Sequence, residues 1–117
     1  MTCLTKKNIF DTNDIEIKRV DVPEWGGYVY VKNITAKQRD RFEVSFVENR
    51  NKGLENINAR GHLVAISTCD KDGKLLFNLA DIDKLGQKSG KALDRIFEVS
   101  QKMNGLDYEA VKVKRKN

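Results

Sequence analysis

The spacing of hydrophobic residues changes along the chain, and these changes outline the secondary structure. Residues 15–22 (IEIKRVDV) and 28–34 (YVYVKNI) alternate apolar with polar side chains, which predicts two strands with one buried face each. After residue 35 the spacing becomes helical, with Phe42 and Phe46 four residues apart on one face. Helical spacing returns near the end of the chain, at Leu93, Ile96, Phe97, Ser100 and Met103. The pattern predicts a strand pair followed by helices.

Turn and capping residues stand at the expected boundaries of these elements. Between the two strands, residues 23–27 (PEWGG) suit a hairpin connection, because proline fits a strand end and glycine accepts positive φ. Thr35 and Gln38 have the spacing of a capping box, which predicts the start of a helix of about four turns. Ser89 caps the last helix, and Gly105 stands where a left-handed residue would end it.

The middle of the chain is less clearly patterned. Asn-rich residues 49–58 predict a mobile loop. Residues 59–69 suit either a buried helix or a strand, and we favour the helix because of their length. An acidic turn at 70–73 (DKDG) follows, then a short extended segment, and Asn78 is expected to cap a helix of one or two turns ending at Gly86.

These elements predict a single small α+β domain, with an N-terminal β-hairpin packed against three or four helices. Its 117 residues are enough for one modest core. We place the domain at residues 15–106, after a loosely ordered segment at 1–14 and before a basic, flexible tail at 107–117. The charged N-terminus lacks the apolar stretch of a signal peptide, and no apolar run could span a membrane, so we expect a cytosolic protein.

The positive charge of the chain is concentrated at its C-terminal end. The net charge is +5, but residues 1–111 hold 18 basic and 17 acidic groups, a net of +1, and the remaining +4 lies in 112–117. Nucleic-acid-binding proteins usually carry their positive charge on the folded body. Binding of RNA or DNA is therefore not the function we favour.

The sequence predicts no catalytic residue, no metal site and no cofactor. The acidic turn at 70–73 lacks the spacing of a calcium loop. His62 is the only histidine, and two helical turns would hold it about 10 Å from Cys69, too far for a hydrogen-bonded pair. Cys3 and Cys69 form no CxxC pair, and in a cytosolic protein we expect both to be reduced thiols. We therefore expect that the protein is not an enzyme.

The order of these motifs resembles a known family. Along residues 9–106 the sequence shows, in this order, a strand ending in VPEWGG, a helix of the form TAKQRDRF, the segment LVAIS, the turn DKDGKLLF, a short DIDKLG helix and a closing ALDRIFEVSQKMNGL helix. This order resembles the tail assembly chaperones of long-tailed bacteriophages and prophages. The Asn-rich loop and the lysine-rich end have no counterpart in the resemblance.

The resemblance implies a chaperone of the host cytoplasm that binds the tape measure protein, keeps it soluble until tail-tube subunits polymerise around it, and is absent from the mature virion. It also implies a frameshifted longer form that recruits tail-tube protein, and it leaves self-association into a homo-oligomer open. The candidate partner contacts are Trp25, Arg39, Phe42 and Phe46, since aromatic side chains dominate interface energies. Two alternatives remain: a head–tail connector or minor tail protein, and a nucleic-acid-binding accessory protein acting through the basic tail.

Overall fold

The computed structural model describes residues 1–53 and 58–106, and its first folded unit is a β-hairpin. Strand β1 (Ile17–Val22) pairs antiparallel with β2 (Gly27–Lys32), with Val20 opposite Val29. A two-residue strand, β3 (Thr68–Cys69), pairs with the other edge of β2 and gives the sheet order β1-β2-β3. The predicted hairpin is confirmed, and β3 makes it a three-stranded sheet.

The connection between β1 and β2 is a 3-10 turn, η1 (Pro23–Trp25). Gly26 follows with a φ of 72°, and its N–H donates to the carbonyl oxygen of Pro23 at 3.0 Å. A side chain at this φ would be strained, which explains the first glycine. Gly27 has no positive φ and instead begins β2, so only one of the two glycines has the predicted role.

Seven helical elements complete the described chain. Besides η1 they are α1 (Lys6–Asp11), α2 (Ala36–Lys52), α3 (Ala59–Ser67), the 3-10 turn η3 (Leu79–Asp81), α4 (Ile82–Leu85) and α5 (Gly90–Met103). The predicted capping box of α2 is present, because the Thr35 hydroxyl accepts from the Gln38 N–H at 3.1 Å and the Gln38 side chain accepts from the Thr35 N–H at 2.8 Å. Helix α2 therefore begins where its capping residues predict.

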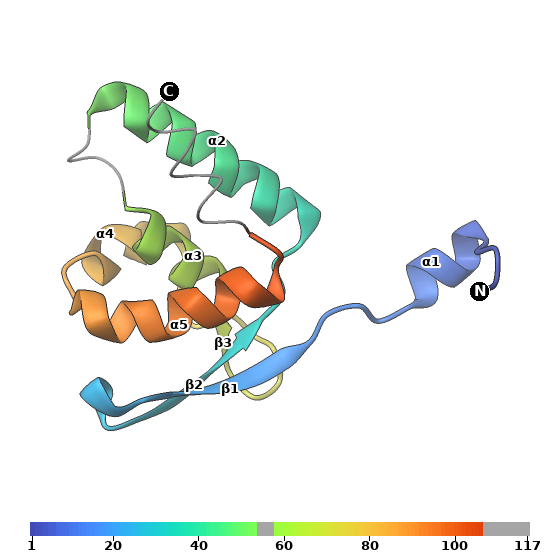
Figure 1. Ribbon diagram of the computed structural model, residues 1–117, viewed down its shortest axis with the longest axis horizontal. Coiled ribbons are helices and arrows are strands. Elements are labelled where there is room, and N and C mark those ends of the chain that lie inside the picture. The colour runs from blue at the N-terminus through green and yellow to red at the C-terminus, as the bar shows by residue number, and fades with distance from the viewer. Residues whose placement is uncertain (54–57, 107–117) are drawn as a thin grey trace.

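The body of the molecule is layered, with the sheet at one side and α2 at the other (Figure 1). Helix α5 packs on β1 and β2, and α3 packs on both α5 and α2. Seven consecutive residues of α3, from Gly61 to Ser67, are buried, because this helix is covered on all sides. Helix α1 stands apart from this body at the end of an extended segment (Figure 1).

Two hydrophobic clusters lie on either side of α3 and α5. The larger cluster faces the sheet and consists of Val20, Val22, Val31, Val64, Ala65, Leu85, Ala92, Leu93 and Ile96. The smaller cluster consists of Ile34, Leu63, Ile66 and Phe97, with Phe42 and Leu106 packed against it. The stripe predicted along the last helix therefore supplies both clusters.

The end of α5 also follows its sequence. Gly105 has a φ of 62°, and the Leu106 N–H donates to the carbonyl oxygen of Gln101 at 2.9 Å, while the Gly105 N–H donates to that of Lys102 at 3.3 Å. This is the predicted Schellman ending.

For the middle of the chain, one expectation is wrong and another is confirmed in part. Residues 49–52, predicted as part of a loop, are the last turn of α2, which continues until Gly53 because no helix-breaking residue occurs earlier. Residues 54–57 lie outside the described part of the chain. The ambiguous residues 59–69 form the favoured helix through Ser67, and the last two form β3. The β-branched residues at the end of that segment therefore serve a strand, as the alternative reading had allowed.

Candidate partner-binding groove

Helix α2 is the largest element with little buried surface. None of its 17 residues is fully buried. Phe42 and Phe46 are half-buried on the side facing α3, whereas Val44 and Val47 are 56% and 47% exposed. A surface helix of a monomer usually buries an apolar stripe, so α2 retains apolar surface that a partner could cover.

The start of α2 is held in place by the end of α5. The Asn104 side chain accepts from the Ile34 N–H at 2.8 Å and donates to the Ser100 carbonyl oxygen at 2.8 Å. Arg39 Nη1 donates to the Asn104 carbonyl oxygen at 3.1 Å, and the Asn33 amide donates to that of Met103 at 3.3 Å. The bonds to Asn33, Ile34 and Arg39 join segments 65–70 residues apart in sequence and set the direction in which α2 leaves the body.

A groove of about 470 Å³ lies between the first turns of α2 and the segment 75–79, which leads into η3. Its floor is α3, through His62, Ala65 and Ile66. The wall from α2 carries polar and basic side chains, and the opposite wall is mostly apolar. The residues of the two walls are the N-cap Thr35 with Lys37, Gln38 and Arg41 of α2, and Leu75, Phe77, Asn78 and Leu79 opposite them.

Several groove residues are available for contact. Leu79 is 47% exposed, and Lys37 and Arg41 are both exposed. His62 is only 8% exposed, and its ring packs edge-on against Phe42 with centroids 5.1 Å apart. Burial, and secondarily the positive charge of Arg41, lowers the pKa of His62, so the imidazole is neutral at physiological pH. The groove is thus apolar below and cationic along one rim.

A solved structure of another protein has a similar architecture. The structure of the bacteriophage HK97 tail assembly chaperone superposes with a TM-score of 0.62, covering 83% of this chain and 90% of that one at 21% sequence identity. This chain has the tail assembly chaperone fold. No protein-family model and no curated protein matches the sequence.

The four predicted contact residues lie at two separate places on this chaperone fold. Trp25 is 40% exposed and belongs to the turn between β1 and β2. That turn lies on the side of the molecule opposite α2 (Figure 1). Arg39, Phe42 and Phe46 all lie on α2, where Arg39 also pairs with Glu43 at 3.2 Å. Phe42 packs on the smaller cluster and beside His62. The structure therefore brings three of the four onto the helix that forms one groove wall, and leaves Trp25 apart.

The groove residues themselves were not predicted as contacts. Lys37 and Arg41 read as ordinary surface charges, and Leu75 and Leu79 as parts of a short extended segment and a short helix. Their only sequence signal is that Lys37 and Arg41 stand four residues apart at the start of an amphipathic helix, which places them on one face. That Leu79 lies opposite them depends on the tertiary fold.

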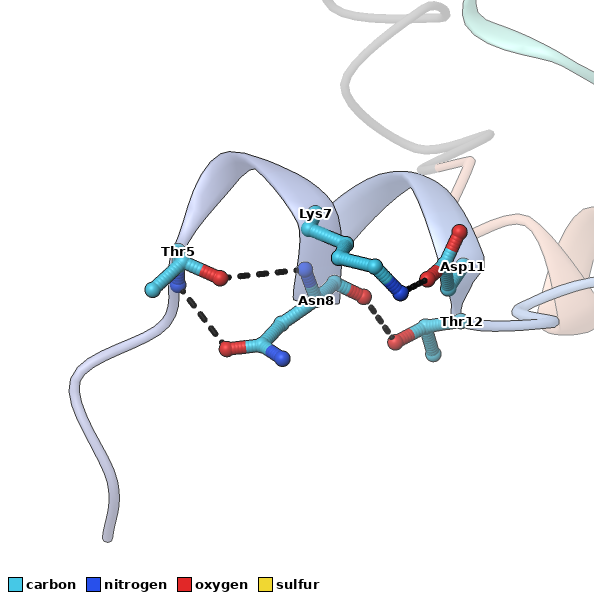
Figure 2. Close-up of polar contacts among 5 residues, drawn as sticks. All are labelled: Thr5, Lys7, Asn8, Asp11 and Thr12. Atoms are coloured by element: carbon cyan, nitrogen blue, oxygen red, sulfur yellow. Dashed lines mark hydrogen bonds and ion pairs between the residues drawn. The ribbon is translucent and has the colours of Figure 1, made fainter.

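The N-terminal helix α1 presents a second apolar surface. Its N-cap Thr5 and Asn8 form a reciprocal capping box, and Lys7 pairs with Asp11 at 2.8 Å (Figure 2). No residue of α1 is buried, and the apolar side chains of this arm are 57% exposed at Ile9 and 76% exposed at Phe10. A helix within residues 1–14 was not predicted, because six residues are too few for a clear hydrophobic period.

The groups considered for chemistry have structural roles. Asp70 accepts hydrogen bonds from the N–H groups of Asp72 and Lys74 at 2.8 and 3.0 Å, which closes the 70–73 turn, and these bonds lower the pKa of its carboxyl. Cys69 lies on β3, buried, and burial raises the pKa of its thiol. Both cysteines are unpaired, as predicted.

Residues 1–53 and 58–106 contain neither a metal-binding cluster nor a membrane-spanning helix. Within these ranges no three His, Cys, Asp or Glu side chains are placed to hold a metal ion, and no helix is long and apolar enough to cross a membrane. The predicted basic tail, 107–117, lies outside them and stays a prediction.

Proposed function

We propose that this protein is a phage tail assembly chaperone that binds the tape measure protein and keeps it soluble in the host cytoplasm until tail-tube subunits polymerise around it. The observation that carries the proposal is the fold shared with the HK97 tail assembly chaperone over most of both chains. The exposed apolar surface of α2 and the adjoining groove support a binding function of this kind.

The physical requirement for such a chaperone is modest. A long helical protein waiting for assembly exposes apolar faces that would otherwise aggregate. An amphipathic helix of the client can lay its apolar face into a groove or against another helix. Helix α2 offers Val44 and Val47 on its surface and the groove beside its first turns, so one client helix could contact both.

Co-expression tests this proposal. The client is the product of the very long, coiled-coil-rich gene expected near this one, and the measurement is its soluble fraction with and without this protein. We expect a several-fold increase with the wild-type chain and a smaller one with Val44→Ser/Val47→Ser. Because both valines are about half exposed, these substitutions should leave the thermal stability nearly unchanged.

The matched control is Leu76→Ser, which alters a leucine that is 51% exposed and does not line the groove. It should solubilise the client as the wild type does. An unchanged soluble fraction with the wild-type protein would refute the proposal.

Mass spectrometry of purified virions separates the chaperone from a head–tail connector or minor tail protein. A chaperone is expected to be missing from the particle. Stoichiometric recovery of this chain with the tail would favour the structural role instead.

A further inference from the structure

The two walls of the groove differ in chemistry, and this difference specifies the segment that would fill it. Lys37 and Arg41 lie on the α2 wall, four residues and thus about one helical turn apart. The opposite wall presents Leu75 and Leu79. Among the described residues that line the groove, none is acidic. An occupant that suits both walls must therefore be apolar on one side and negatively charged on the other.

No residue in the described part of the chain neutralises the two cations. Within residues 1–53 and 58–106, neither Lys37 nor Arg41 takes part in an ion pair or a side-chain hydrogen bond. Arg39 lies between them in sequence on the same helix, but its side chain is paired with Glu43. The positive charge at this rim is therefore free to meet a partner.

The size of the groove limits how deeply the occupant can enter. A volume of about 470 Å³ is that of an ordinary ligand pocket. A complete helix is about 10–12 Å across, so it would lie over the groove and insert only the side chains of one ridge. Helix α2 provides a neighbouring surface along which such a helix could pack.

Building on the proposed function, we infer that the groove binds an amphipathic client helix whose apolar ridge inserts beside Leu79 and whose carboxylates, spaced one turn apart, pair with Lys37 and Arg41. The apolar ridge supplies most of the affinity. The two cations select acidic over basic client segments and set the direction in which the helix lies along α2.

The inference is tested with synthetic peptides and the full-length protein. Three fluorescent helical peptides share a leucine ridge at i, i+3, i+4 and i+7 and carry Glu, Gln or Lys at the two flanking positions. Each exposed charge pair changes affinity about two- to five-fold, so we expect the Glu peptide to bind about ten-fold more tightly than the Lys peptide. The preference should shrink at high salt, because exposed pairs are screened.

Two charge-reversal double variants test whether the preference for acidic peptides arises at the groove. Lys37→Glu/Arg41→Glu should reverse the preference, whereas Lys71→Glu/Lys88→Glu, with the same change in net charge at exposed positions outside the groove, should retain it. Leu79→Ser should weaken all three peptides about equally, and Leu76→Ser should weaken none.

Several results would overturn the inference. One is equal affinity for the three peptides, and another is a preference that both charge-reversal pairs alter equally. A third is that Phe10→Ser binds the peptides more tightly than the wild type and no longer self-associates. That result would show that the exposed arm of a second copy occupies the groove in the wild-type protein.

The peptide assay and the co-expression assay can fail separately. If the client is solubilised but the peptides show no charge preference, the proposed function stands and the inference about the groove fails. If the charge preference is present but the long coiled-coil product stays insoluble, the groove takes an acidic helix from another client and the proposed function fails.

Discussion

Replacing Asn104 by alanine tests how α2 is fixed to the body. Its side chain accepts from the Ile34 N–H and donates to the Ser100 carbonyl oxygen. Since Ile34 is only 8% exposed, water cannot easily replace the lost acceptor. An unsatisfied buried N–H costs about 1–3 kcal/mol, and the bond to Ser100 adds about 1 kcal/mol. We therefore expect Asn104→Ala to lower the free energy of unfolding by about 2–4 kcal/mol.

Chemical denaturation with thermal melting measures this loss, which corresponds to a fall in Tm of about 10–20 °C for a domain of this size. Asn49→Ala is the control, because the half-buried Asn49 makes only a 3.4 Å hydrogen bond to Ser45 within α2. It should change stability by less than about 0.5 kcal/mol. If both variants lose the same stability, or Asn104→Ala loses less than 0.5 kcal/mol, the anchoring role is wrong. Below its Tm, Asn104→Ala should also bind the acidic peptide more weakly, because the direction of α2 sets the basic rim.

Three further predictions concern α3 and the cysteines. Gly61→Ala should destabilise the protein by about 1 kcal/mol despite the higher helix propensity of alanine, because its Cβ would lie 2.5 Å from the side-chain amide that caps α3. Gly90→Ala is the control and should not destabilise the protein, because the space around Gly90 is open. Equal melting temperatures for the two variants would contradict this prediction. Because burial depresses the pKa of His62 below its ordinary 6.5, the unfolded chain takes up a proton more readily, so stability should fall as the pH drops below about 6.5. His62→Gln should remove the part of this loss that begins below about pH 6.5, and an unchanged pH profile of Tm would refute the assignment. Thiol labelling of the native protein should modify the exposed Cys3 and spare the buried Cys69, and rapid labelling of both would show that β3 opens readily.

Local chemistry made much of the fold readable. The alternation at β1 and β2, the capping residues Thr35 and Ser89, and the glycine ending α5 each act over a few residues. Their geometry depends on neighbours in sequence, so the patterns identified them directly. Residues 49–52 were misjudged as loop, and α1 was missed because it is too short for a clear pattern. Local signals conflicted in residues 59–69, where the favoured helix is confirmed through Ser67 and only the last two residues form a strand.

The candidate site depended on contacts between distant segments. The sequence alone determined that α2 is an amphipathic helix carrying Arg39, Phe42 and Phe46, since helical periodicity assigns them to it. Only the tertiary structure decided that the Asn104 bonds orient α2, and that Leu79 faces Lys37 and Arg41 across α3. The physical reason is that a groove is the space between elements, and its shape follows from packing of the two hydrophobic clusters rather than from any one segment.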